Sequence, residues 1–157
     1  MTIPSEGGGR RSDTVALIVA DEQDRLLVMW HEKHAFWTVP LGKVEEGEVD
    51  VGAARREAFE ELGIVSDHVE LLDTIHKPAD LDEYSDILIA LCLIANYTGE
   101  VANREPDKHR GLHFAHLAEI ADMQPLSYPT KFIVGRDGVG QSQQMRSDHR
   151  PVLADIV

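Results

Sequence analysis

Three glutamates, Glu57, Glu60 and Glu61, are spaced so that they could bind a metal ion together. In an α-helix, residues three and four positions apart project from one face, which gathers the three carboxylates. Like charges at this spacing repel one another. Mg²⁺ binds carboxylates together with substrate phosphates, and it can generate hydroxide from bound water. The spacing therefore favours metal-assisted cleavage of a phosphate compound.

The same glutamates could instead lie on a solvated helix face, stabilised by ion pairs such as Arg56 with Glu60. The surrounding residues argue for the metal. The segment resembles the Nudix box, which reads Gly, five residues, Glu, seven residues, Arg-Glu, an aliphatic, any residue, Glu-Glu, any residue, Gly and an aliphatic. The matching residues are Gly42, Glu48, Arg56, Glu57, Glu60, Glu61, Gly63 and Ile64. Ala58 departs from the pattern, because a larger aliphatic is usual there.

The resemblance to the Nudix family implies a role for each conserved position of the box. The implied metal ligands are the carboxylates of Glu57, Glu60 and Glu61 and the carbonyl of Gly42. One of these acids, or a carboxylate on a later loop, would be the general base. Arg56 would orient the glutamates, with Glu48 bracing it. The expected cofactor is Mg²⁺, with Mn²⁺ as a substitute.

A further acidic ligand is expected from a loop after the central strands. Glu105, in the segment Asn103-Arg-Glu-Pro-Asp-Lys, is our candidate, because similar segments occur in small nucleotide-cleaving members of the family. Glu83 and Asp86 are rivals. A solvated turn residue beside a proline is the alternative for Glu105.

The substrate is predicted less sharply than the reaction. We expect a nucleoside diphosphate derivative, in the first place a (d)NTP that yields (d)NMP and diphosphate. Pro78 lies at a spacing seen in members that cleave ADP-ribose, so an ADP-ribose or nucleotide-sugar pyrophosphatase is the alternative. A non-catalytic ligand-sensing module is the alternative from another class. The candidate substrate-binding residues are Trp37, Lys43, Tyr84 and Asn103, with Trp30 and Phe36 as further walls.

The sequence assigns no chemical role to the histidines. His31 and His34 lie at a predicted strand end and lack the helical HExxH pattern of a zinc site, so we expect surface or packing roles. His109, His113 and His116 surround a short strand and are assigned no function.

The elements that must position these residues follow from hydrophobic periodicity. The pattern predicts a hairpin of strands 14–20 and 26–30, a strand at 36–39 and a loop at 41–48. A helix should begin with Asp50 as N-cap and end before Gly63. Further strands are predicted at 69–76, 87–97 and 111–116, the second of them central, and weaker helices at 117–121 and 130–134. The predicted class is α/β with a mixed sheet, and the resemblance implies the Nudix α/β/α sandwich.

Composition excludes several partners. The net charge is −13, from 28 acids against 15 Lys and Arg, which opposes binding to a nucleic-acid polymer. The apolar runs are too short for a bilayer, so no membrane partner is expected. A single cysteine, Cys92, lies within an apolar run and should be a buried thiol. We expect a cytoplasmic protein, with homodimerisation open, in which a flexible N-terminus (1–13) and a C-terminal tail (136–157) flank a Nudix hydrolase domain (14–135).

Overall fold

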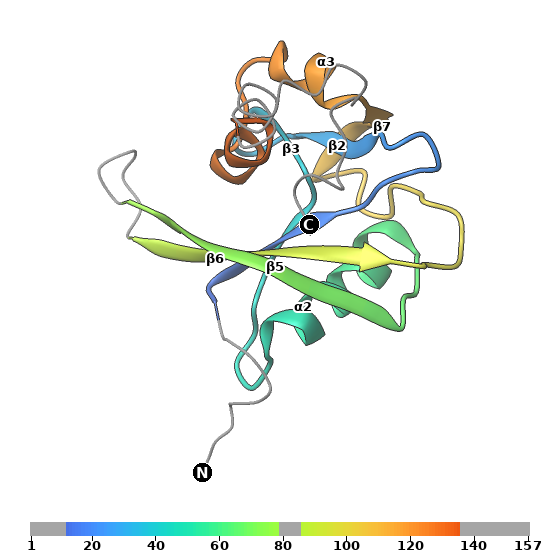
Figure 1. Cartoon of the computed structure of the whole chain (residues 1–157), viewed down its shortest axis with the longest axis vertical. Coiled ribbons are helices and arrows are strands. Elements are labelled where there is room, and N and C mark those ends of the chain that lie inside the picture. The colour runs from blue at the N-terminus through green and yellow to red at the C-terminus, as the bar shows by residue number, and fades with distance from the viewer. Residues whose placement is uncertain (1–11, 79–85, 136–157) are drawn as a thin grey trace, which may run out of the picture. The chain divides into compact units, whose positions relative to one another are not determined.

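The structure is a computed structural model that describes residues 12–78 and 86–135 (Figure 1). The chain forms two units, which are described separately. The first contains the stretch up to Ile18 and residues Leu41–Arg104, and the second contains Val19–Pro40 and the stretch from Glu105 onward. The predicted tail and all but two residues of the predicted N-terminus lie outside the described residues.

The first unit is built on a four-stranded mixed sheet in the order β4-β1-β6-β5. Its strands are β1 (Thr14–Ile18), β4 (Leu41–Lys43), β5 (His68–Lys77) and β6 (Ile87–Ala95). Strand β1 pairs parallel with β6 and antiparallel with β4, and β5 pairs antiparallel with β6. The two interior strands are the most apolar, as expected for strands covered on both faces.

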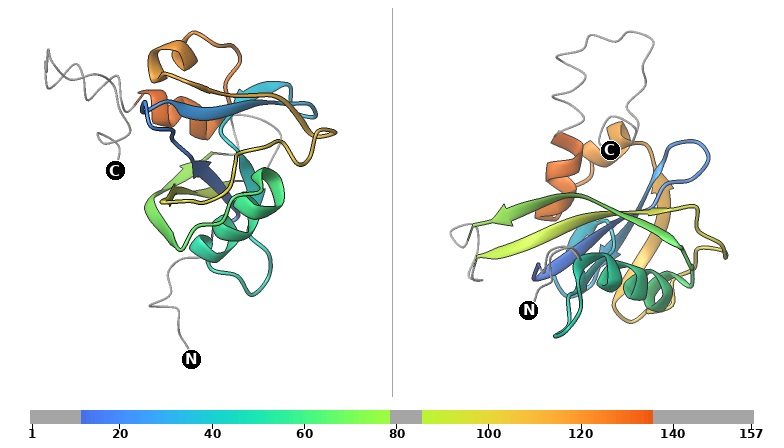
Figure 2. Two further views of the ribbon diagram at one scale, coloured as in Figure 1. Left: turned by 90° about the vertical axis from the view of Figure 1, so that its right-hand side faces the viewer. Right: turned by 60° about the horizontal axis from the view of Figure 1, so that its bottom comes forward.

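A helical segment lies against this sheet (Figure 2). It starts as the α-helix α2 (Asp50–Glu57) and continues without a break into a wider π-helical turn, η1 (Ala58–Leu62). Small side chains allow a close approach to the strands, because Ala53, Ala54 and Ala58 are all at most 1% exposed. Gly63 ends the segment in the left-handed conformation, with φ of 74°, as the sequence predicts.

The second unit contains a three-stranded antiparallel sheet in the order β3-β2-β7. Its elements are β2 (Leu26–His31), β3 (Phe36–Thr38), β7 (His109–Ala115), α3 (Leu117–Ala121) and a helix over residues 128–135. The hydroxyl of Thr130 accepts a hydrogen bond from the N–H of Val39 at 3.0 Å and so ties this last helix to the chain after β3.

The α/β class and the mixed sheet are confirmed, and three local predictions are wrong. The strands of the predicted hairpin, β1 and β2, belong to different sheets. The two segments are joined by the bridge between Ala20 and Leu26 and by a hydrogen bond from the Leu27 N–H to the Val19 carbonyl. The expected loop at 41–48 begins as strand β4, which gains partners from β1. The N-cap is Val49, because the Asp50 carboxylate is occupied in accepting bonds from the N–H and hydroxyl of Ser12, at 2.6 and 2.9 Å.

Two other expectations can be compared with the described residues. Cys92 is fully buried, as predicted. Among the helices within residues 12–78 and 86–135, none has the length and apolar character needed to cross a membrane.

Candidate metal-binding active site

Arg56 is the centre of the acidic site in the first unit. Its Nε and Nη2 donate to the two carboxylate oxygens of Glu48, at 2.7 and 2.9 Å. Its Nη1 donates to Glu57 at 3.2 Å and to Glu60 at 3.1 Å. Its Nη2 also reaches the carbonyl oxygen of Lys43 at 2.9 Å. One guanidinium therefore joins the loop after β4 to the acidic helix. The hydrogen bond with Glu48 and the nearby carboxylates raise the already high pKa of Arg56.

The three glutamates of the helix differ in burial. The Glu60 side chain is 51% exposed, the Glu57 side chain is 12% exposed and Glu61 is 5% exposed. The alternative interpretation of the sequence, a solvated helix face stabilised by ion pairs, does not describe this arrangement. The wider turn η1 begins directly after Glu57 and carries both Glu60 and Glu61, so their positions depart from an ideal α-helix.

The buried pair Glu57 and Glu61 has unfavourable electrostatics in the absence of a cation. Burial raises the pKa of Glu57, while a hydrogen bond with Glu61 and the nearby Arg56 act in the opposite direction and Glu60 adds repulsion. Two carboxyl groups in hydrogen-bond contact can share a proton or bind a cation. The donor set is all oxygen, which fits a hard dication such as Mg²⁺.

Gly42 lies in β4, where it pairs with Val15, and borders the acid cluster. A Cβ atom added at this position would overlap the side chain of Glu57. Glycine is therefore required because the main chain and the carboxylate approach each other closely. This proximity is consistent with the carbonyl role that the resemblance implies.

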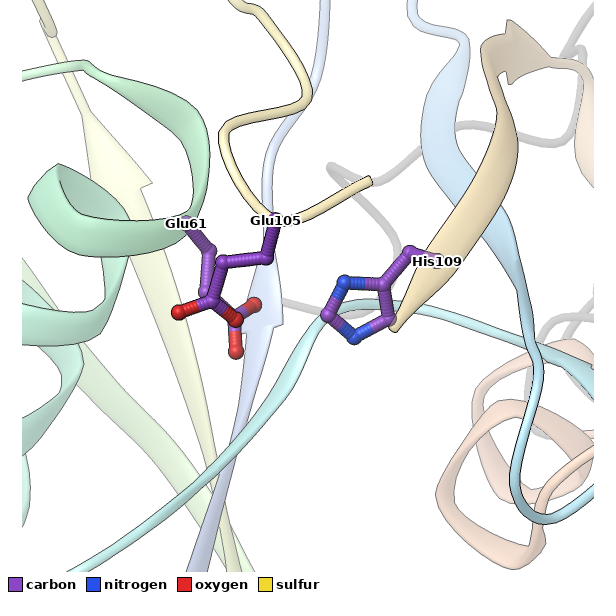
Figure 3. A group of neighbouring side chains, drawn as sticks. All are labelled: Glu61, Glu105 and His109. Carbon is purple, nitrogen blue, oxygen red and sulfur yellow. The ribbon is translucent and has the colours of Figure 1, made fainter. Parts of the chain in front are cut away.

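In the second unit, Glu105 and His109 lie together at the start of β7 (Figure 3). The N–H groups of Lys108 and His109 both donate to the Glu105 carbonyl, at 2.9 and 3.1 Å, and form a tight turn. A carboxylate oxygen of Glu105 and a ring nitrogen of His109 are within 4.8 Å of each other. Figure 3 also labels Glu61, which belongs to the first unit.

His109 was missed by the sequence reasoning. It is 3% exposed, and burial lowers the pKa of its imidazole, so the neutral form predominates near neutral pH. His109 follows Glu105 by four residues, and this spacing brings the two side chains together only if the segment between them forms a turn. The sequence predicted a strand beginning at 111 and did not include this turn.

The last residues of the first unit are hydrogen-bonded to the end of the acidic helix. The N–H of Arg104 donates to the carbonyl of Glu61 at 2.9 Å, and the N–H of Ala102 donates to Leu62 at 3.0 Å. Glu105 follows Arg104 directly, and consecutive α-carbons are about 3.8 Å apart. The segment that ends at Arg104 is therefore fastened to the end of η1 within the first unit.

The candidate substrate residues are distributed over both units. Trp37 lies edge-on to Trp30 and to His113, with centroid separations of 5.5 and 5.9 Å. The side chain of Lys43 is exposed in the first unit, and Asn103 is half-buried there. Tyr84 and Glu83 lie outside the described residues. The rival acid Asp86 lies 3.5 Å from His76 in an exposed pair.

Comparison with known proteins identifies the family. The family model described as the NUDIX domain matches residues 10–132. The chain belongs to the NUDIX domain family. The predicted resemblance to this family is thereby confirmed.

Individual NUDIX proteins resemble the chain to different extents. An RNA pyrophosphohydrolase from Psychrobacter sp. (strain PRwf-1) is 38% identical over 58 residues, and the match covers 37% of this chain and 34% of that protein. The chain thus matches only about a third of the length of this curated relative. The crystal structure of a MutT NUDIX hydrolase from Burkholderia pseudomallei has 26% identity and a TM-score of 0.69, covering 80% of this chain and 97% of its own.

A further structure agrees in fold alone. The solution structure of the E. coli ORF135 protein is 20% identical with a TM-score of 0.68, and it covers 89% of this chain and 97% of its own. The predicted Nudix fold class is therefore confirmed by the family model and by solved structures.

Proposed function

We propose that this NUDIX domain uses Mg²⁺ to hydrolyse a phosphoric anhydride bond in a nucleoside diphosphate derivative, in the first place a (d)NTP to (d)NMP and diphosphate. The observation that carries the proposal is the single guanidinium of Arg56 bonded to Glu48, Glu57 and Glu60. A solvated helix face gains little from ion pairs. The convergence of this arginine on three acids indicates an organised site.

The chain's residues have distinct parts in this proposal. The proposed metal ligands are the carboxylates of Glu57, Glu60, Glu61 and Glu105 and the carbonyl of Gly42. The bound metal would neutralise phosphate charge and lower the pKa of water. One of the carboxylates removes the proton from the attacking water, while Glu48 and Arg56 hold the acids in place.

The residues proposed for substrate binding supply positive charge, hydrogen bonds and a planar surface. Lys43 has an exposed ammonium group beside the loop that Arg56 fastens, which suits a phosphate oxygen. Asn103 offers an amide, and Trp37 an aromatic ring for a base. Tyr84 remains a candidate from the sequence alone.

Other substrates are distinguishable from a (d)NTP. Because Pro78 lies at a spacing seen in members that cleave ADP-ribose, ADP-ribose and sugar nucleotides are the second class of candidate substrates. The Psychrobacter relative is named an RNA pyrophosphohydrolase, so RNA is a further candidate substrate. A net charge of −13 opposes binding to a long polyanion, so we propose a small nucleotide. The complete set of acids argues against a non-catalytic sensing module.

The test is a substrate panel with matched variants. The chain is incubated with (d)NTPs, ADP-ribose, sugar nucleotides and 5′-triphosphorylated RNA, each with Mg²⁺, Mn²⁺ or a chelator, and phosphate and diphosphate release are measured. We expect metal-dependent turnover that falls about a hundredfold or more in Glu60→Gln and Glu61→Gln. Glu70→Gln, an exposed acid on β5, is the control and should keep full activity. Absence of turnover on every compound would contradict the proposal.

Three further properties remain proposals. We propose that residues 14–135 form the folded hydrolase domain, that the protein works in the cytoplasm, and that it forms a homodimer. Light scattering of the purified chain measures the oligomeric state, and a monomer at all concentrations would exclude the dimer.

A further inference from the structure

We propose that Glu105 and His109 form a mixed oxygen and nitrogen site for a transition-metal dication of the Co²⁺ to Zn²⁺ group. The proposal rests on the proposed function only in treating Glu105 as a metal ligand. It differs from the proposed Mg²⁺ site, which also uses Glu105, in its nitrogen donor: Mg²⁺ prefers oxygen ligands, whereas imidazole suits cobalt, nickel and zinc.

The geometry of the turn supports a shared ion. A carboxylate oxygen of Glu105 and a ring nitrogen of His109 already lie within 4.8 Å of each other. Two donors that each lie about 2.1 Å from one ion can be at most about 4.2 Å apart. A separation within 4.8 Å is therefore close to the range that one shared ion requires, and rotation of the Glu105 side chain can adjust it. The two bonds to the Glu105 carbonyl from Lys108 and His109 hold the backbone of the turn while the side chain moves.

The imidazole is held more firmly than the carboxylate. His109 pairs with His31 across β7 and β2, and the two rings meet edge-on at 5.3 Å. His109 is 3% exposed, whereas the Glu105 side chain is 28% exposed. The pair therefore combines a buried nitrogen donor with a carboxylate on a partly exposed side chain, which gives an ion a route to the site.

The neighbouring cation does not block this route. The Lys108 ammonium lies 3.6 Å from Glu105 and its side chain is 67% exposed. Because the lysine end of this pair lies largely in solvent, an arriving dication can displace the ammonium at small cost.

A different role for His109 would be to orient Glu105 without touching an ion. The two roles predict different metal specificity. Loss of an orienting group would weaken binding of every cation that uses Glu105. Loss of an imidazole ligand would weaken cobalt and zinc selectively, because Mg²⁺ makes no use of the nitrogen.

The experiment measures ion binding without any nucleotide. Calorimetric titrations with Co²⁺ and with Mg²⁺ compare the wild-type chain, His109→Gln and the control His68→Gln, which removes an exposed histidine. We expect His109→Gln to weaken Co²⁺ binding about tenfold or more and Mg²⁺ binding less than about twofold. Neither affinity should change in the control. Equal weakening of both ions, or no weakening, would overturn the proposal.

A second variant keeps the proposal testable if glutamine disturbs folding. His109→Cys places a thiolate, another ligand suited to cobalt, at the same position. Added Co²⁺ should then give a sulfur-to-cobalt charge-transfer band in the near ultraviolet that the wild type lacks. Absence of this band would show that residue 109 does not reach the ion. Because no substrate is present, an inactive chain would refute the proposed function and leave this result unaffected.

Discussion

Arg56 and Glu48 form a two-bonded pair in which Nε lies 2.7 Å and Nη2 2.9 Å from the carboxylate oxygens. The pair joins the loop after β4 to the acidic helix. Since a bidentate pair fixes direction as well as distance, the remaining Nη1 is aimed at Glu57 and Glu60.

This geometry predicts that lysine cannot replace Arg56. Lysine keeps the charge but has one nitrogen, so it cannot hold Glu48 and the helix acids together. We expect Arg56→Lys to lower kcat/KM about tenfold or more, with a small change in Tm, measured by steady-state kinetics and thermal unfolding. Arg25→Lys, which alters a partly buried pair with Asp21 in the second unit, is the control and should leave activity unchanged. Unaltered kinetics in Arg56→Lys would count against the bracing role.

Two glycines give opposite predictions for the same substitution. In Gly42→Ala the new methyl group would overlap Glu57, so the carboxylate or strand β4 must move. We expect a loss of about 1–3 kcal/mol in the free energy of unfolding, together with weaker metal binding. In Gly52→Ala, within α2, the nearest atom is a Val49 methyl at 3.8 Å, an ordinary contact.

The Gly52→Ala variant therefore serves as the control. It should raise the free energy of unfolding by about 0.5–1 kcal/mol, because alanine restricts the unfolded chain and favours helix. Urea denaturation measures both variants. The steric explanation fails if Gly42→Ala is as stable as the starting protein.

The buried pair of Ser12 and Asp50 should stabilise the start of the helix. Asp50 is 1% exposed and accepts both the N–H and the hydroxyl of Ser12. Asp50→Ala would leave these donors without their acceptor and should cost about 1–3 kcal/mol of unfolding free energy. Ser12→Ala removes one of the two bonds and should cost less. A double-mutant cycle by urea denaturation should give a clear coupling energy, and strictly additive effects would refute the interaction.

Cys92 should be unreactive in the folded protein. Burial, with a smaller contribution from Asp50, raises the pKa of its thiol from 9.0 to about 12. Since the thiolate is the nucleophile, iodoacetamide at pH 8 should modify the unfolded chain and spare the native one. Mass spectrometry of both samples measures this difference. Equal labelling of the two would contradict the burial.

The same shift predicts a dependence of stability on alkaline pH. The pKa of the folded state lies above that of the unfolded state, so the contribution is fully present below about pH 9 and is lost as the pH rises toward 12. The difference in unfolding free energy between wild type and Cys92→Ala should therefore shrink above pH 9. A constant difference up to pH 11 would rule out this ionisation effect.

Local features were predictable from the sequence because their causes are local. The acidic helix ends at Gly63 as predicted, and Arg56 contacts Glu48 across the spacing that the box specifies. The long apolar strand β6 was correctly placed inside the sheet, because a strand covered on both faces needs apolar side chains throughout.

Predictions failed where pairing joins distant parts of the chain. Periodicity gives β1 and β2 the appearance of a hairpin, but β1 gains a parallel partner in β6, where Leu17 pairs with Cys92. Nothing in the turn between β1 and β2 reveals that partner. Asp50 failed as an N-cap for a similar reason, since its carboxylate is taken by Ser12. The burial of His109 likewise depends on β2, which sequence spacing cannot show.

The π-helical turn η1 has a consequence for transplanting the Nudix box. Glu60 and Glu61 lie in a segment wound more widely than an α-helix, with the Gly63 N–H reaching the Ala58 and Phe59 carbonyls. If the same residues were placed on a regular α-helix, Glu60 and Glu61 would be rotated about the helix axis relative to Glu57 and Arg56. A transplanted Nudix box must therefore keep the π-helical backbone as well as the residues. The transplanted segment must include Gly63, because this residue closes the wide turn.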